Sequence, residues 1–161
     1  GVGLAHKTEA GAVALGLGSA EAVEAAALGM SADAFLVEQQ ITGSVAELLV
    51  GVIADPAHGY VLTLGAGGTL TEVLGDTVSL LLPVCAEDVR EALAALRLAP
   101  VLAGYRGAPA VDMQAVVDAV LAVQAYVAEA RPLEVEINPL ICTPDAAYAA
   151  DALIRMGGSD D

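Results

Sequence analysis

Apolar residues recur along this chain with the spacings that distinguish helices from strands. A long helix with one buried face is predicted at residues 111–130, and shorter helices at residues 19–28 and 86–96. Ser19 is a candidate N-cap for the first short helix. Residues 99–109, rich in Gly and Pro, predict a loop. Short apolar runs predict strands at residues 11–17, 34–41, 46–56, 58–68, 77–84, 133–143 and 147–154.

The order of these elements predicts an α+β fold, because several strands precede two helices and a strand pair closes the chain. Hydrophobic residues make up 57% of the 161 residues, and the mean hydropathy of +0.68 argues against disorder. Gly, Pro or a charged residue interrupts every apolar run before the ~18 to 20 residues that a membrane span needs. The N-terminus lacks a signal-peptide pattern. Gly1 is not an initiator, so we expect the chain to begin within a longer protein.

The net charge of −15 excludes some partners. A surface this acidic repels phosphate backbones, so we expect no nucleic-acid partner, no membrane partner and a cytoplasmic location. A small phosphorylated ligand stays compatible if the few basic residues gather near it. Cys85 and Cys142 lack metal-ligand spacing and predict buried free thiols in a reducing compartment.

Three oxygen-bearing side chains interrupt the apolar C-terminal strands. Glu136 and Asn138 are two residues apart, so both face the same side of a strand. If residues 147–154 pair antiparallel with the preceding strand, Asp151 returns close to Asn138. Oxygen ligands with few charges suit Mg²⁺, which keeps waters and takes further ligands from substrate phosphates. A solvent-facing strand without a ligand is the alternative explanation.

Two glycine-containing stretches are candidates for phosphate binding. In "HKTEAGAV", at residues 6–13, the Lys7 ammonium can neutralise phosphate oxygens and the backbone can turn its N–H groups inward. In "LGAGGTLTEV", at residues 64–73, glycines after a strand let the backbone approach a ligand. An ordinary polar turn explains either stretch equally well. His58 follows Pro56 in a predicted turn and receives no role.

Taken together and in order, the chain's segments resemble the ATP-grasp domain of NDP-forming acyl-CoA synthetases, the group typified by ADP-forming acetate–CoA ligase. The β subunit of succinyl-CoA synthetase is a more distant resemblance. The resemblance covers nearly the whole chain. The matching stretches are "HKTEAGAV", "FLVEQQITGSVAELLVGVIADPAHG", "LGAGGTLTEVLGD", "APVLAGYRGAPAVD" and "EINPLI" followed by "AADALI".

The resemblance implies a fold that binds ATP or ADP between two lobes. It implies that "FLVEQQI" is a hinge strand bordering adenine, with Glu38 and Gln39 nearest, and that Glu47 contacts the ribose or a nearby polar group. The other implied ATP-binding residues are Lys7, Gly67 and Gly68. Asn138 and Asp151 match the family's Mg²⁺ ligands.

The resemblance also implies a reaction, in which a phosphoryl group moves from ATP to a histidine and then to an acyl group, and leaves as CoA attacks. His6 matches a histidine proposed as the phosphate relay, and a near-neutral imidazole is a competent nucleophile. Glu136 matches a glutamate that meets a phosphohistidine loop from a CoA-binding partner domain. The implied partners are CoA-binding and succinyl-CoA-synthetase-like domains or a subunit, which would supply the acyl substrate and CoA.

We expect residues 1–161 to form a partial ATP-grasp domain, incomplete at its N-terminus and inactive alone. Residues 1–56 are assigned to part of the nucleotide-gripping lobe, and residues 57–161 to the C-terminal lobe with the metal-binding strands. Relatives often have Arg where this chain has Leu80 and Lys where it has Gly75. The alternative is therefore a non-catalytic ATP-grasp-like module that binds nucleotide or regulates.

Overall fold

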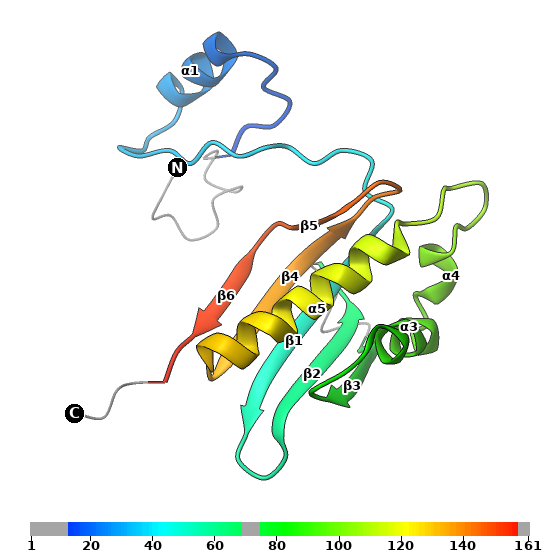
Figure 1. Cartoon of the computed structure of the whole chain (residues 1–161). Helices are drawn as coiled ribbons and strands as arrows, with labels where there is room; N and C mark the ends of the chain where they lie inside the picture. Colours follow the sequence, from blue (N-terminus) through cyan, green and yellow to red (C-terminus); the bar gives the residue numbers. More distant parts are fainter. Residues whose placement is uncertain (1–12, 69–74, 158–161) are drawn as a thin grey trace. The chain divides into compact units, whose positions relative to one another are not determined.

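The computed structural model describes residues 13–68 and 75–157, drawn in colour in Figure 1. The chain divides into two compact units, Gly1–Thr42 and Gly43–Asp161. The predicted His6 and Lys7 lie outside the described residues. Each unit is taken separately below.

The first unit contains one described helix. Helix α1 spans Ala20–Leu28, and the side chain of Ser19 accepts a hydrogen bond from the Ala22 N–H at 3.2 Å, as its N-cap role predicts. None of the helix residues is buried. The expectation of strands at 11–17 and 34–41 is wrong over the described residues, because residues 13–17 and 34–41 pair with no strand there. An extended segment needs a ladder partner to become a strand.

The second unit is built on an antiparallel sheet of six strands. Its order is β3-β2-β1-β4-β5, and β6 also pairs with β4. The prediction of antiparallel pairing between the two C-terminal segments is confirmed, because both β5 and β6 pair antiparallel with β4. The strands are β1 (Ala46–Asp55), β2 (Gly59–Ala66), β3 (Thr77–Leu81), β4 (Glu134–Cys142), β5 (Ala147–Ala149) and β6 (Ala152–Arg155).

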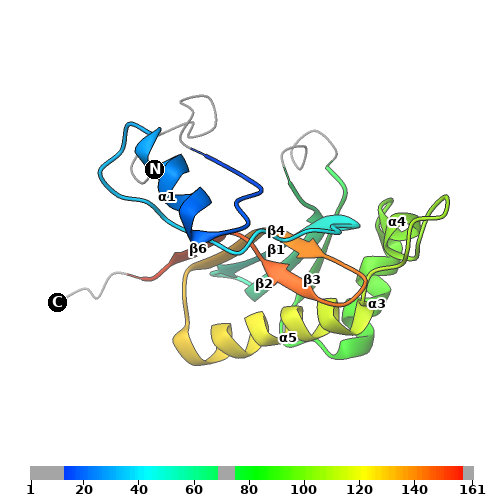
Figure 2. The same ribbon diagram turned by 90° about the horizontal axis from the view of Figure 1, so that it is seen from above.

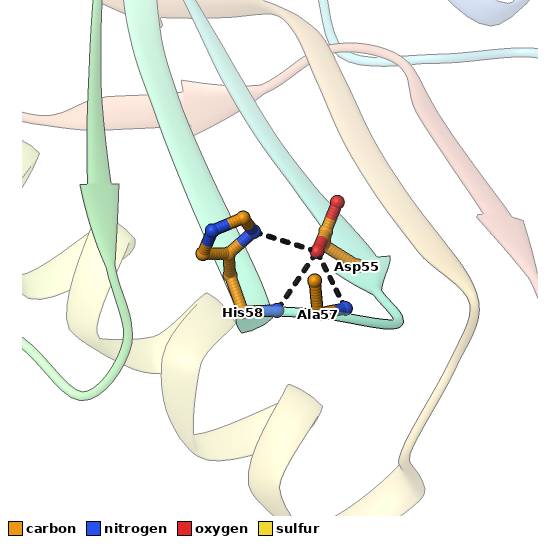
Figure 3. A network of polar contacts seen from close by, with 3 residues as sticks. All are labelled: Asp55, Ala57 and His58. Atoms are coloured by element: carbon orange, nitrogen blue, oxygen red, sulfur yellow. Dashed lines mark hydrogen bonds and ion pairs between the residues drawn. The ribbon is translucent and has the colours of Figure 1, made fainter.

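Strands β1 and β2 form a hairpin whose turn is held by one carboxylate. Oδ1 of Asp55 accepts hydrogen bonds from the N–H groups of Ala57 and His58, both at 2.8 Å, and lies 2.9 Å from Nδ1 of His58 (Figure 3). The Ala57 N–H and the His58 side chain lower the pKa of Asp55. These contacts give His58 a local role in the turn.

Three helices of this unit pack with the sheet. They are α3 (Ala86–Ala95), α4 (Ala99–Leu102) and α5 (Met113–Ala130), so the predicted loop at 99–109 begins with a helical turn. Asp112 caps α5 by accepting the Ala115 N–H at 3.0 Å. Figure 2 shows α5 and α3 on one side of the sheet. Helix α5 has the length and apolar composition of a membrane span, but five of its valines are buried: Val116, Val117, Val120, Val123 and Val127.

The two cysteines differ in their surroundings. Cys142 is buried at the end of β4, and burial raises the pKa of its thiol to about 12. Cys85, at the N-cap of α3, is exposed, so the prediction that it is buried is wrong. Its position at a helix start explains the exposure, because a cap residue lies outside the packed face of the helix. Both thiols are free.

The division between the units falls at Thr42 and Gly43, earlier than the lobe boundary at residues 56 and 57 that we expected. Strand β1 hydrogen-bonds along its length to β2 and β4, so it folds with the second unit. The assignment of lobes to a nucleotide site stays a prediction.

Candidate functional site

The sheet has two chemically different faces. Along β1, Leu48, Val50 and Val52 are each 1% exposed and belong to the core under the helices. The alternate residues of β1 project from the other side. We call that side the open face and define it by Glu47, Leu49, Gly51 and Ile53 of β1 together with the residues paired with them: Val61, Thr63 and Gly65 of β2, and Glu134, Glu136 and Ile141 of β4.

Two glycines at the end of β2 lie directly against β1. The Gly67 N–H donates to the Glu47 carbonyl oxygen at 2.8 Å. A Cβ on Gly67 would collide with the backbone of Leu48, and a Cβ on Gly68 would collide with the carboxylate of Glu47. Gly68 also has a φ of +81°, which favours glycine. The predicted ATP-binding residues Glu47, Gly67 and Gly68 are therefore in direct contact.

Asn138 joins this group from the neighbouring strand. Its Oδ1 accepts the Gly68 N–H at 2.9 Å, although the two residues are 70 positions apart in the sequence. The register between β1 and β4 shifts at this point, so Asn138 and Pro139 together face Leu49 of β1. Such a bulge re-aims a side chain on one face of a sheet. The amide of Asn138 thereby reaches the glycine pair.

Asp151 is hydrogen-bonded to Asn138 through the backbone. The Asn138 N–H donates to the Asp151 carbonyl oxygen at 3.3 Å. Asp151 is exposed and follows β5, two residues before Leu153, which opposes Glu136. The structure thus brings the backbones of Asn138 and Asp151 together, as the strand pairing predicts. Among the described residues no group of three or more His, Cys, Asp or Glu side chains could hold a metal ion, so any metal here would have few protein ligands.

Glu136 lies next to a glycine in the middle of the open face. It opposes Gly51 on β1 and Leu153 on β6. On its other side, Gly51 opposes Thr63, whose hydroxyl lies 3.2 Å from that of Ser79. Glu136 is half-buried, and within the part of the chain that the structure describes it has no hydrogen bond or ion pair.

Asp76 lies next to the glycine pair, and the sequence analysis did not predict it as a site residue. Its carbonyl oxygen accepts the Ala66 N–H at 3.0 Å, next to Gly67. Its carboxylate accepts the N–H groups of Arg97 and Leu98 at 2.9 and 3.0 Å. Burial raises the pKa of Asp76, but these two N–H groups and the Arg97 charge outweigh that effect and lower it. The sequence signal was a carboxylate directly before a strand, after Gly75.

Two further predicted site residues, Glu38 and Gln39, belong to the first unit. Glu38 and Gln39 are exposed in the first unit, in a segment that forms no strand. The neighbouring Gln40 accepts the Gly16 N–H through Oε1 at 2.6 Å. Within the second unit, the cluster consists of Glu47, Gly67, Gly68, Asn138 and Asp151, with Glu136 beside it.

In the second unit, helices α3 and α5 cover one face of the sheet, and the glycines and oxygen-bearing side chains gather on the other. The chain belongs to the ATP-grasp domain family, whose model matches residues 2–156. It is similar to β subunit I of ADP-forming acetate–CoA ligase from Pyrococcus furiosus, with 35% identity over 107 residues, 66% of this chain and 46% of that subunit. It is also similar to a trans-feruloyl-CoA synthase from an unknown prokaryotic organism, with 32% identity over 168 residues, 95% of this chain and 24% of that enzyme.

Solved structures agree with this assignment. The dinucleotide-forming acetyl-coenzyme A synthetase 1 of Ca. Korarchaeum cryptofilum matches with a TM-score of 0.84 and 27% identity, over 95% of this chain and 71% of that chain. It was solved with coenzyme A and Mg-AMPPCP, with its phosphohistidine segment pointing towards the nucleotide-binding site. The chain spans about half the length of the Pyrococcus β subunits that it matches.

Proposed function

We propose that this chain is the nucleotide-binding part of an NDP-forming acyl-CoA synthetase. The enzyme would couple formation or cleavage of an acyl-CoA thioester to interconversion of ATP and ADP through a phosphohistidine. The relatives named for ADP-forming acetate–CoA ligase support this reaction class. CoA-binding domains or a partner subunit would supply the acyl group and CoA, and the cytoplasm is the compartment that such metabolic chemistry favours.

One observation carries the proposal: the Asn138 amide, the Gly67–Gly68 pair and Glu47 meet on the open face from three strands. Glycines bring backbone N–H groups close to a ligand because no Cβ intervenes. The Gly67 N–H already donates to the Glu47 carbonyl oxygen, so the Gly68 N–H is the candidate donor to a phosphate oxygen. Glu47, at the edge of the pair, is the candidate for a ribose hydroxyl, which donates to a carboxylate.

The donor set fits Mg²⁺. Asn138 supplies a neutral amide oxygen and Asp151 a carboxylate, and their backbones are hydrogen-bonded to each other. Mg²⁺ is typically bound through one or two protein oxygens plus waters and phosphates, so the small number of acidic groups here is compatible with it. When bound, it would neutralise phosphate charge. Asn138 would then hold the metal in place of the Gly68 N–H, and that N–H would turn to a phosphate oxygen.

His6 and Lys7 enter the proposal from the sequence alone. His6 is assigned as a phosphate relay, Lys7 as a cation at the phosphates, and Glu136 as the carboxylate that meets a phosphohistidine segment. Glu136 suits this role because it is half-buried and its carboxylate accepts hydrogen bonds from an imidazole N–H. Glu38 and Gln39 are assigned to the adenine edge.

Calorimetry with Mg-AMPPCP tests the assignment, on the protein that contains this chain. Asn138→Ala combined with Asp151→Ala is expected to weaken binding in Mg²⁺ by about tenfold or more and to remove its dependence on Mg²⁺. Glu129→Ala is the matched control, because Glu129 is an exposed acid on α5. Unchanged metal dependence in the double variant would refute the ligand assignment.

A non-catalytic module is the second candidate, because Leu80 stands where relatives often carry a cation. Leu80, however, opposes Leu62 and packs against the core under the helices, so the missing cation takes nothing from the open face and the structure does not favour this candidate. Measuring acyl-CoA formation beside nucleotide binding separates the two functions. Tight Mg-AMPPCP binding without turnover, in the presence of the partner domains, would favour the module.

A further inference from the structure

Gly51 lies in the middle of β1, where neither close packing nor its backbone conformation requires a glycine. A glycine in a strand interior weakens the strand by roughly 0.5–1 kcal/mol relative to Ala. Its φ does not lie in the left-handed region, and it is paired in register on both sides, with Thr63 and Glu136. A Cβ at this position would meet nothing closer than the Thr63 carbonyl oxygen at 4.0 Å.

The other glycines of the sheet centre are different. A Cβ on Gly65 would lie 2.7 Å from the Asp76 carbonyl oxygen, and Cβ atoms on Gly67 and Gly68 would collide with β1. Close packing therefore explains those three glycines. Gly51 alone of these four has free space above it. A glycine in a strand interior marks either a bulge or a close approach of a ligand to the backbone, and the register shift in this sheet lies at Leu49, two residues away.

The two side chains directly opposed to Gly51 are polar, whereas its neighbours on the same face of β1 are Leu49 and Ile53. Thr63 lies on one side of Gly51, and its hydroxyl pairs with that of Ser79 at 3.2 Å, which leaves the pair one proton to donate. Glu136 lies on the other side without a partner among the described residues. Asn138 is two residues beyond Glu136 on β4, so the space lies within about 8 Å of the proposed metal position.

Resting on the proposed function, we propose that Gly51, which has no side chain, leaves room for the terminal phosphate of the metal-bound nucleotide. Thr63 lies beside it as a hydroxyl donor. A divalent cation bound to a nucleotide triphosphate bridges the two phosphates farthest from the base. The space above Gly51 is next to that position. Glu136 would repel a bare anion, and a bound divalent cation would offset part of that repulsion.

The test is the affinity of Gly51→Val for two nucleotide analogues, Mg-AMPPCP and Mg-AMPCP, measured by calorimetry on the protein that contains this chain. We expect the dissociation constant for Mg-AMPPCP to rise by about tenfold or more. The constant for Mg-AMPCP, which lacks the terminal phosphate, should rise by less than about threefold. Gly51→Ala should give an intermediate loss. Ala54→Val is the control, because Ala54 is exposed on the same strand and alternates to the opposite face.

The outcomes separate this inference from the proposed function. No binding of either analogue by the unchanged protein would overturn both. Binding by the unchanged protein with no loss in Gly51→Val, or with equal losses for both analogues, would overturn the role of Gly51 alone. The melting temperature should stay level or rise in Gly51→Val. A large fall in both Gly51 variants would show that the strand itself needs the glycine and would overturn the inference.

Discussion

The two faces of the sheet differ in what their residues contribute, although they are built from the same strands. On the face under α3 and α5, β1 presents Leu48, Val50 and Val52, all buried. On the open face the same strand presents Glu47 and Gly51. The alternation of a strand therefore separates stability from chemistry within ten residues. A substitution on one face should change the free energy of unfolding, and a substitution on the other should change binding.

The largest expected effect comes from the core under the helices. Leu48→Ala removes a side chain that is 1% exposed and leaves a cavity. The loss in the free energy of unfolding should be about 2–5 kcal/mol, measured by urea denaturation.

Leu49→Ala is the matched control, since it makes the same change at the next residue but on the open face, where Leu49 is only half-buried. Its loss should be clearly smaller than that of Leu48→Ala. Equal losses for the two variants would contradict the division between the faces.

The second largest loss of stability is expected at Asp76, which hydrogen-bonds both to the end of β2 and to the residues just before α4. Asp76→Ala leaves the N–H groups of Arg97 and Leu98 without their acceptor. The free energy of unfolding should fall by about 1–3 kcal/mol. Asp76→Asn retains an acceptor oxygen and should lose less, so equal losses in a denaturation experiment would count against the hydrogen bonds as the cause.

The same carboxylate predicts a dependence on pH. Because the pKa of Asp76 is lowered in the folded state, its contribution to stability is fully present above the unfolded value of about 4. That contribution is lost as the pH falls through the lower folded pKa. The stability difference between the unchanged protein and Asp76→Asn, measured from pH 7 to pH 2, should narrow only in the acid range. A difference that widens in acid would reverse the assigned sign.

Local signals were sufficient to predict most of the elements. Ser19 caps α1, and the valine spacing of residues 111–130 forms the buried face of α5. The C-terminal strand pairing also followed from the sequence, and it placed Asn138 beside Asp151. These features depend on neighbours in the chain or on simple alternation, which a sequence displays directly.

Features that depend on distant partners were not predictable in the same way. Residues 34–41 have the composition of a strand, but no strand among the described residues pairs with them. The contact of Asn138 with Gly68 depends on a register shift in β4, where Pro139 signals an irregularity but does not show which residue meets Asn138. The space above Gly51 could be located only once the pairing register of β1 with β2 and β4 was known.

The smallest expected effect lies on the open face at Glu134 and Arg155. These residues are opposed across β4 and β6, with Nη2 of Arg155 2.9 Å from Oε2 of Glu134. The arginine side chain is 64% exposed, so solvent screens the pair. A double-mutant cycle with Arg155→Ala and Glu134→Gln should give a coupling of about 0.2–1 kcal/mol that shrinks in high salt. A coupling above about 2 kcal/mol would mean that open-face charges contribute to stability on the scale of the core. The separation of stability from chemistry between the two faces would then fail.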